Sequence, residues 1–412
     1  MRTAFLLEGI PKSVKRLSDK MRSRNKTRRK QFTRGDEIAI GEWGSRLARY
    51  RLPGLAFGGS IFEKMSLRSI KGSLKYPLIR AGLEAIAFSG APALFPAAGG
   101  RGVVFTMHHV KPEDAIDRTD PNAILSITPH TLEMAIEAAL EAGLLPVHLH
   151  DLPRLLSEQA DTRKYVAFTL DDGYRNNAEF AAPVFARYNI PYTIFITTGF
   201  VERKRSMWWR TIAALVTEAD GFQFNFGGGA VDVRSATPAQ KSAAFARLVQ
   251  FMQCFDEDEA VARIDAAAQT VGIDAISLVD ESVMNPSELR SLALDPLVHL
   301  GAHTVTHVNL RRVDDKRLVK EIADSTESVQ RYAGYRPRSF AYPYGWKAAV
   351  GEREIRAVSA AGFDVGVTTQ PGVLQQTGAM PAAAIPRISL NGYFQKKRYI
   401  KALVSGLPFK LL

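Results

Sequence analysis

The sequence predicts an α/β fold: a distorted (β/α) barrel of about seven strands, with a mostly helical insertion and a basic N-terminal extension. Three observations carry this prediction. Short apolar runs typical of strands alternate with helix-patterned segments from about residue 101 onward, which favours a parallel sheet with covering helices. Polar residues directly follow three of these runs. The alternation stops between about 200 and 285 and then resumes.

Length and composition are those of an ordinary globular protein. The chain has 412 residues, of which 46% are hydrophobic and 23% charged. These values exclude a fully disordered chain, a collagen and a disulfide-rich mini-protein. Cys254 is the one cysteine in the sequence, so no disulfide can form within the chain and a reducing compartment is expected.

The positive charge is concentrated at the N-terminus. The net charge is +12, and residues 1–34 hold 12 Lys or Arg against 2 Asp or Glu, leaving +2 for residues 35–412. We expect no nucleic-acid partner, because the folded body is nearly neutral. Residues 1–64 are predicted to be a basic extension, either disordered, an upstream in-frame addition before Met65, or an arm that makes weak contact with anionic lipid.

The expected elements follow in chain order. Residues 65–100 form a lead-in with one or two short amphipathic helices, and residues 101–412 form the barrel. Thr128 and Pro129 are typical of a helix start, and that helix should run to about 142. Further helices are expected up to about 187 and near 314–333. The predicted strands are 103–107, 147–149, 165–170, 192–196, 298–301, 340–342, 363–368 and 385–388, which suit a closed (β/α) barrel.

The insertion should contain its own small core. A helix led by Trp208 and Trp209, a hairpin around Gly227–Gly229 and one helix from about 238 to 271 are expected there. We interpret the two tryptophans as packing residues.

No membrane span or leader is expected. The sequence has no run of 18 apolar residues, and the apolar run 3–7 is shorter than the core of a secretory signal. We therefore expect a cytoplasmic protein.

Three strand ends carry side chains suited to chemistry. They are His108–His109, Asp171–Asp172 and His303 with His307, and parallel barrels place their sites at such ends. His303 and His307 are four residues apart and would project to one side of a helical turn. Two histidines and one carboxylate leave an open position on a catalytic zinc, although non-haem iron uses the same set. A cation would also relieve the repulsion between two adjacent carboxylates.

These strings resemble a known family. "FTLDDGYRNN", "GAHTVTH" and "FAYPYG" are similar, in that order, to the first three motifs of the polysaccharide deacetylases, carbohydrate esterase family 4 with its NodB-homology domain. The resemblance implies one divalent metal, zinc or else Co²⁺, Ni²⁺ or Mn²⁺, held by Asp172, His303 and His307. It implies that Asp171 is the base, and that an N-acetylated saccharide is hydrolysed to acetate and a free amino sugar.

The resemblance also indicates where substrate binds. The backbone N–H of Tyr174 would stabilise the oxyanion. The segment Tyr342, Pro343, Tyr344 and Gly345 would line the pocket, with the two tyrosine rings available to stack on a sugar.

Two family features are missing. No arginine precedes Pro343 in the third motif, and no histidine follows His307. We predict that Arg387, at the end of the last strand, pairs with Asp171 instead. We predict that His109 lies in the pocket as the general acid, with His108 on the opposite face because neighbours on a strand alternate. His130, His148, His150 and His299 are interpreted as structural.

Other functions remain open at this level. The missing arginine and histidine would also suit an inactive sugar-binding relative, and the two-histidine-one-carboxylate set would suit a non-haem iron enzyme. The particular glycan and the oligomeric state do not follow from the sequence.

Overall fold

Seven parallel strands form one curled sheet, with an eighth at its side. The strand order is β11 (Val365–Val367), β10 (Ser339–Ala341), β9 (Val298–Ala302), β6 (Tyr192–Ile196), β5 (Lys164–Leu170), β1 (Gly102–Met107) and β12 (Ile388–Ser389). β4 (Leu144–Pro146) pairs with the first half of β5. Ile385, just before β12, bridges to Val367 of β11, so the last segment of the chain nearly joins the two sheet edges. The predicted distorted barrel is confirmed.

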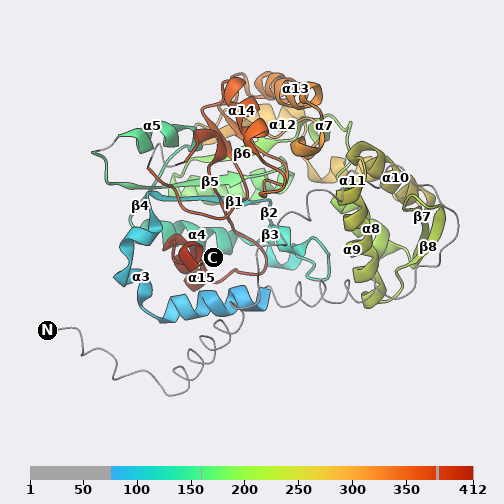
Figure 1. Cartoon of the computed structure of the whole chain (residues 1–412), viewed down its shortest axis with the longest axis horizontal. Helices are drawn as coiled ribbons and strands as arrows, with labels where there is room; N and C mark the ends of the chain where they lie inside the picture. Colours follow the sequence, from blue (N-terminus) through green and yellow to red (C-terminus); the bar gives the residue numbers. More distant parts are fainter. Residues whose placement is uncertain (1–75, 159, 377–379, 412) are drawn as a thin grey trace, which may run out of the picture. The chain divides into compact units, whose positions relative to one another are not determined.

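The computed structural model describes residues 76–158, 160–376 and 380–411, and Figure 1 shows their elements. All of them belong to one unit, Ile70–Leu412. The predictions about the basic extension 1–64, its lipid contact and a start at Met65 concern residues outside this description. Of the lead-in, residues 76–88 are helical.

The strands divide the core into two layers. Val104, Ala167, Phe195 and Ala341 belong to one buried cluster, which fills the inside of the curled sheet. Alternate residues such as Phe105 belong to a second cluster beneath the covering helices. Because side chains alternate along a strand, this register decides which strand-end residues face inward.

The helices cover the outer face of the sheet (Figure 1). Thr128 caps α4 (Pro129–Glu141) by accepting a hydrogen bond from the backbone N–H of Thr131, as the sequence indicates. A π-helical turn, η5 (Asn177–Ala181), leads into α6 (Ala182–Tyr188). The other covering helices are α7 (Thr198–Val201), α12 (Pro286–Leu292), α13 (Asp315–Ala333), α14 (Glu352–Ala360) and α15 (Lys397–Val404). The leucines of α5 (Leu152–Ser157) belong instead to the inner cluster.

Short elements complete the described chain. They are α3 (Ala91–Leu94), η1 (Pro96–Gly99), β2 (His109–Val110), η2 (Glu113–Ala115), η3 (Ala123–Leu125), β3 (Ser126–Ile127), η4 (Leu149–Asp151), η6 (Leu310–Arg312), η7 (Ala382–Ala384) and α16 (Pro408–Leu411). The predicted strand 147–149 is wrong, since β4 ends at Pro146 and a 3₁₀ turn begins at Leu149.

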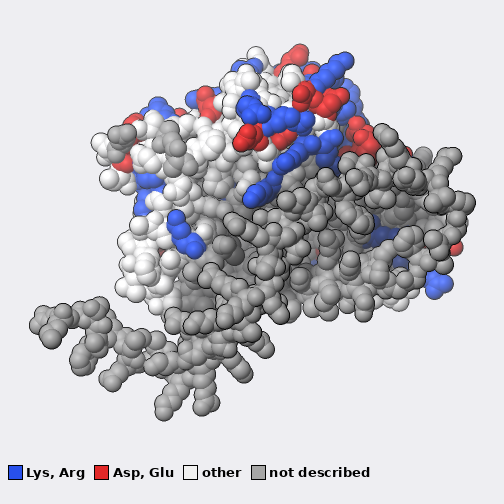
Figure 2. Space-filling model, in the orientation of Figure 1, with Lys and Arg blue, Asp and Glu red and all other residues white. Residues whose placement is uncertain are grey.

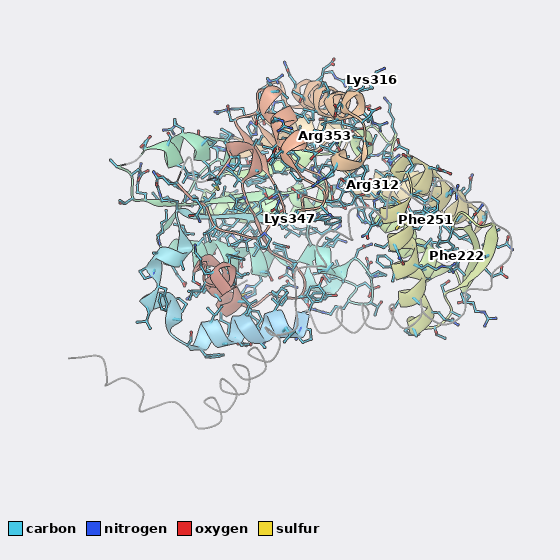
Figure 3. All side chains as sticks on the ribbon, viewed as in Figure 1. Phe222, Phe251, Arg312, Lys316, Lys347 and Arg353 are labelled. Atoms are coloured by element: carbon cyan, nitrogen blue, oxygen red, sulfur yellow. The ribbon has the colours of Figure 1, made fainter. Side chains whose placement is uncertain are left out.

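The insertion folds around a separate core. It comprises α8 (Trp208–Glu218), the hairpin β7 (Gly221–Asn225) and β8 (Ala230–Arg234), α9 (Pro238–Cys254), α10 (Glu257–Thr270) and α11 (Ala275–Ser282). Phe222 and Phe251, labelled in Figure 3, belong to its buried cluster. The single helix predicted for 238–271 is wrong: Phe255 is extended, and Asp256 starts a new helix by accepting from the N–H of Glu259.

Charges of both signs mingle on the surface formed by the upper helices in Figure 2. Several pair one turn apart, as Lys320 does with Asp324 on α13 and Arg356 with Glu352 on α14. This mixture agrees with the nearly neutral folded body. Among the described helices, none combines the length and apolar character needed to cross a bilayer.

Candidate metal centre

Three ligand-type side chains converge at the carboxyl ends of the strands. Nε2 of His303 and Nε2 of His307 each lie 3.6 Å from Oδ1 of Asp172. Within the described residues this is the one group of three or more His, Cys, Asp or Glu whose candidate ligand atoms lie within 4.8 Å of one another. The convergence expected of these residues is therefore present.

The geometry suits a tetrahedral ion. Bonds of about 2.0–2.2 Å in a tetrahedron set ligand atoms about 3.3–3.6 Å apart. Nδ1 of His303 donates to the carbonyl oxygen of Ala341 at 2.7 Å, which leaves the Nε2 lone pair of that histidine available. Oδ1 of Asp172 is buried without a hydrogen-bond partner. An orphaned carboxylate oxygen facing two imidazole nitrogens is what a divalent cation would satisfy.

The histidine pair sits on an irregular loop and not on the helical turn we expected. Thr304 and His307 both have left-handed φ values, of 63° and 56°. The side chain of Thr304 accepts a hydrogen bond from the N–H of His307. These turns bring the two rings together, with centroids 5.0 Å apart, without any helix.

A buried glutamate fixes this loop. Glu321 on α13 is 2% exposed, and its carboxylate accepts the backbone N–H groups of Val305 and Thr306 and the Thr306 hydroxyl. Arg317, one turn earlier, donates to the same carboxylate at 2.7 Å. No motif in the sequence indicates this clamp, although a glutamate on the apolar face of an amphipathic helix is a usable signal.

Backbone strain is concentrated at the site. The described chain has six non-glycine residues with positive φ, and four of them are Asp172, Thr304, His307 and Tyr344. Such conformations persist where the surroundings enforce them, often at functional sites.

Arg387 pairs with Asp171 as predicted, although it lies just before β12 and not at the end of that strand. Its guanidinium donates to both oxygens of Asp171 at 2.7 Å, and also to the Thr169 hydroxyl and the Thr368 carbonyl oxygen. Both members of the pair are buried. Burial alone would raise the pKa of Asp171, but the charge and hydrogen bonds of Arg387 hold that pKa well below its usual value.

The pKa of Asp172 is shifted in the opposite direction from that of Asp171. Burial, and then the charge of Asp171, raise the pKa of Asp172 to about 8. The Tyr174 hydroxyl acts against this rise through its hydrogen bonding to the carboxyl. Trp209 Nε1 donates to that hydroxyl at 3.2 Å, which leaves the hydroxyl proton free to point at Asp172. The Tyr174 side chain is fully buried beneath the site, while the role expected of its backbone N–H stays a prediction.

The side chains of the two strand-end histidines face the opposite way from our prediction. His108 lines the cavity together with Asp171 and Asp172, whereas His109 does not. The His109 ring packs on Tyr174, and its Nδ1 is 2.9 Å from Nδ2 of Asn176. The reason is strand register: with Val104 and Thr106 facing inward, the next inward position after Thr106 is His108.

The adjacent asparagines hold both histidine positions. Nδ2 of Asn177 donates to the backbone carbonyl of His108 at 2.7 Å, and the Asn176 side-chain oxygen accepts the N–H of Val110. Both belong to the "DDGYRNN" string, so the segment that supplies the carboxylates also positions the histidine strand.

A cavity of about 850 Å³ opens onto these groups. Tyr342 and Tyr344 line it, whereas Pro343 and Gly345 do not. Tyr342 is 1% exposed and its hydroxyl donates to the carbonyl oxygen of Ala383, so the prediction that its ring is available to stack on a sugar is wrong. Gly345 has φ of 65°, and a Cβ there would lie 2.5 Å from the backbone nitrogen of Thr369, so the turn requires glycine.

Trp208 and Trp209 pack edge to face, as a packing role predicts, but both also line the cavity. Trp208 Nε1 donates to the Tyr344 hydroxyl at 3.1 Å, and that hydroxyl donates to the buried Glu257 of α10. The insertion therefore forms part of the site, which the sequence alone did not indicate.

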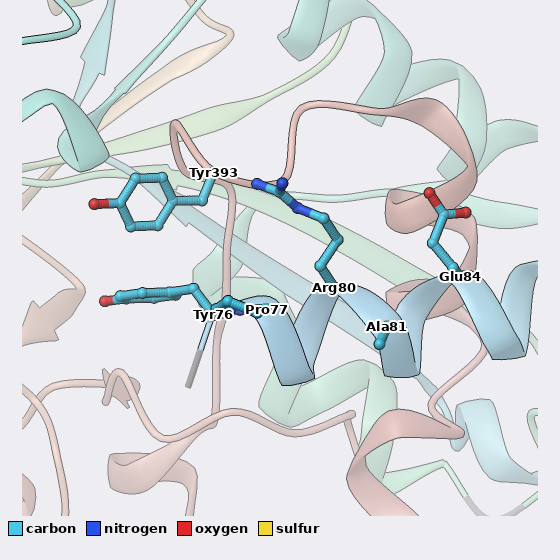
Figure 4. Close-up of a pocket in the computed structure, with 6 residues that line it drawn as sticks. All are labelled: Tyr76, Pro77, Arg80, Ala81, Glu84 and Tyr393. Carbon is cyan, nitrogen blue, oxygen red and sulfur yellow. The ribbon is translucent and has the colours of Figure 1, made fainter. Parts of the chain in front are cut away.

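The remaining histidines and the smaller recess lie apart from the centre. His148, His150 and His299 form their own stack, with centroids 5.1 and 4.4 Å apart, and His130 is exposed. A recess of about 420 Å³ lies between the 76–88 helix and Tyr393 and is lined by Arg80 and Glu84 among others. Figure 4 draws its lining residues. None of its lining residues belongs to the metal centre.

This chain is similar to known proteins in sequence and in fold. The family model described as polysaccharide deacetylase matches residues 158–226 and 254–366. A search of curated proteins gives no match. Several solved structures are similar at low identity. The Streptococcus pyogenes deacetylase PplD in complex with acetate is 16% identical, over 71% of this chain and 92% of that one, with a TM-score of 0.41.

Two further structures are similar to the same extent. IcaB from Ammonifex degensii is 16% identical over 73% of this chain and 98% of that one, with a TM-score of 0.45. The putative polysaccharide deacetylase BA0330 from Bacillus anthracis is 13% identical over 70% and 65%, with a TM-score of 0.43. Both segments matched by the family model contain centre residues: Asp171 and Asp172 in the first, His303 and His307 in the second. The segments 158–226 and 254–366 therefore form a polysaccharide deacetylase domain.

Proposed function

We propose that this chain hydrolyses the N-acetyl group of an N-acetylated saccharide with the help of one divalent metal, zinc being the ion we expect. One observation carries the proposal: Asp172, His303 and His307 converge beside a separate carboxylate, Asp171, whose two oxygens accept hydrogen bonds from Arg387. A ligand set with a separate base beside it is the arrangement that amide hydrolysis needs.

Asp172, His303 and His307 would hold the metal. When bound there, it would polarise the amide carbonyl and lower the pKa of a water molecule. The residues of the chain perform the proton transfers. Asp171 accepts a proton from the attacking water as its oxygen bonds to the carbonyl carbon. Arg387 orients Asp171 and keeps it ionised beforehand.

The leaving amine also needs a proton. We assign its delivery to His108, which lines the cavity, in place of His109. Transfer of this proton as the C–N bond breaks gives acetate and the free amino sugar. The backbone N–H of Tyr174 is the candidate donor to the developing oxyanion.

The test is acetate release from N-acetylated oligosaccharides by the purified full chain. Chelation should abolish release and added Zn²⁺ should restore it. Asp171→Asn should lower turnover about 10²–10⁴-fold, the usual worth of a positioned base, with bound metal per chain unchanged. Asp114→Asn, an exposed change on η2, is the control.

The same experiment separates the alternatives. A sugar-binding relative without activity would bind oligosaccharide but release no acetate with any metal. A non-haem iron enzyme would contain iron when purified, and zinc would not restore its activity.

A further inference from the structure

The cavity that contains the polar centre also has apolar lining residues, which we call the apolar wall. Phe245, Val249 and Met252 of α9 line it, together with Ile124 and Leu125 of η3. The α9 residues are spaced by four and three positions, so they form one stripe along the helix. Phe245 and Val249 are only half-buried, which means that their apolar surface faces the cavity.

One member of this stripe, Met252, also belongs to the buried core of the insertion. Ala244, Leu248 and Phe251 form the neighbouring stripe of α9 and are buried in the insertion core with Phe222 and Phe224. Val249 belongs to no buried cluster of the described residues, and Phe245 only borders one. Packing of the insertion therefore accounts for the second stripe and for Met252, and it leaves Val249 and the half-buried Phe245 facing the cavity.

The wall is fixed to the barrel. Arg312 of η6, labelled in Figure 3, donates through Nη1 to the carbonyl oxygen of Met252 at 2.7 Å. Glu257, at the start of the next helix, accepts from the Tyr344 hydroxyl and from the N–H of Asn309. These contacts join both ends of the α9–α10 corner to loops beside the metal centre, so the apolar face is already in place before substrate arrives.

The wall also lies outside the segments shared with the family. The family model matches residues up to 226 and again from 254, so Phe245, Val249 and Met252 fall in the part it leaves out. Aliphatic lining such as Val249 favours methylene groups over sugar hydroxyls, because hydroxyls placed against it would lose hydrogen bonds to water.

We propose that the substrate of this centre carries an apolar chain close to its N-acyl group, and that this chain lies along the α9 stripe. The inference rests on the proposed function. The chain is either attached to the sugar or is the acyl group itself, and both present the same methylene surface to Phe245 and Val249.

The experiment uses the full, zinc-loaded protein and three soluble substrates below their micelle concentrations. They are methyl N-acetylglucosaminide, its octyl glycoside, and methyl N-octanoylglucosaminide, and the readout is kcat/KM for release of the carboxylic acid. Each methylene that enters the cavity should raise kcat/KM by up to about fourfold. A preference for the octyl glycoside places the chain on the sugar, and a preference for the octanoyl amide places it on the acyl group.

Two variants of α9 test whether the preference for an apolar chain depends on this helix. Val249→Asn should reduce the ratio of octyl or octanoyl to methyl-acetyl turnover by at least tenfold, while the exposed neighbour Gln250→Asn should leave the ratio unchanged. Melting curves of both variants show whether either has lost its fold. If Val249→Asn unfolds, Val249→Ala tests the same ratio with a smaller change.

The outcomes separate the two proposals. Hydrolysis of all three substrates at equal kcat/KM overturns the apolar-chain inference and leaves the hydrolase intact. Absence of any hydrolysis overturns the proposed function, and calorimetric binding of the octyl against the methyl glycoside then decides the inference: equal affinity refutes it, and tighter octyl binding that Val249→Asn removes supports it.

Discussion

At the scale of single residues, the pair between Arg387 and Asp171 joins positions 216 residues apart. Arg387→Lys keeps the charge but cannot donate to both carboxylate oxygens in the same fork. We expect a fall in kcat of about tenfold or more and a shift of the acidic limb of the kcat–pH profile to higher pH, because the pKa of Asp171 rises. An unchanged profile would show that Arg387 has no influence on the base.

Arg387→Met should cost about 3–5 kcal/mol of stability, since it leaves a buried carboxylate unpaired.

Glu321 provides a second test at this scale. Glu321→Gln removes acceptor capacity from the loop that carries His303 and His307, so the two rings lose their fixed separation. We expect metal affinity to fall about 10–100-fold, the usual effect of losing a residue that orients ligands. Competition with a chelator measures this. Glu327→Gln, an exposed change on the same helix, should bind metal as the unaltered chain does.

At the scale of elements, two glycines with similar φ values allow the cost of backbone strain to be measured apart from the cost of a steric clash. One of them, Gly345, lies in the turn after β10. Gly345→Ala adds a Cβ 2.5 Å from the Thr369 nitrogen, whereas Gly334→Ala adds one at a similar φ, 78°, in open space. We expect Gly334→Ala to cost about 1 kcal/mol and Gly345→Ala clearly more, because both meet the left-handed penalty but only Gly345 meets backbone. Denaturant unfolding measures the two costs. Equal costs would mean that the loop that carries Thr369 moves to make room for the added Cβ without a loss of stability.

The same elements show what the sequence could predict. Strands β1, β5, β6 and β9 follow from apolar runs that end in polar residues, and the metal ligands follow from those ends. The choice between His108 and His109 depended on strand register, which becomes readable only once Thr106 is known to face inward. The exposure of Phe245 and Val249 to the cavity could not be predicted, because in the sequence they form one apolar pattern with the core positions of α9.

At the scale of the whole molecule, acid stability depends on histidines far from the metal centre. His299 on β9 is buried with both ring nitrogens unpartnered, and His148, His150, Tyr335 and Arg338 surround it. Burial, and then the neighbouring histidines, lower the pKa of His299 to about 3. In the unfolded chain a histidine titrates near about 6.5. Between these two values the unfolded chain binds more protons, so stability must fall as the pH falls.

We therefore expect the free energy of unfolding to decrease below about pH 6.5, with His299 contributing up to about 1.4 kcal/mol for each pH unit down to about pH 3. His299→Gln removes this titration, so its stability should depend less steeply on pH than that of the unaltered chain, even if it is less stable at pH 7. His130→Gln changes an exposed histidine on α4 and should keep the original slope. Urea unfolding of the three proteins between pH 4 and 7, as metal-free chains, measures the slopes. Parallel curves for His299→Gln and the unaltered chain would mean that His299 is protonated in the folded protein, and the stack of three neutral rings would then have to be wrong.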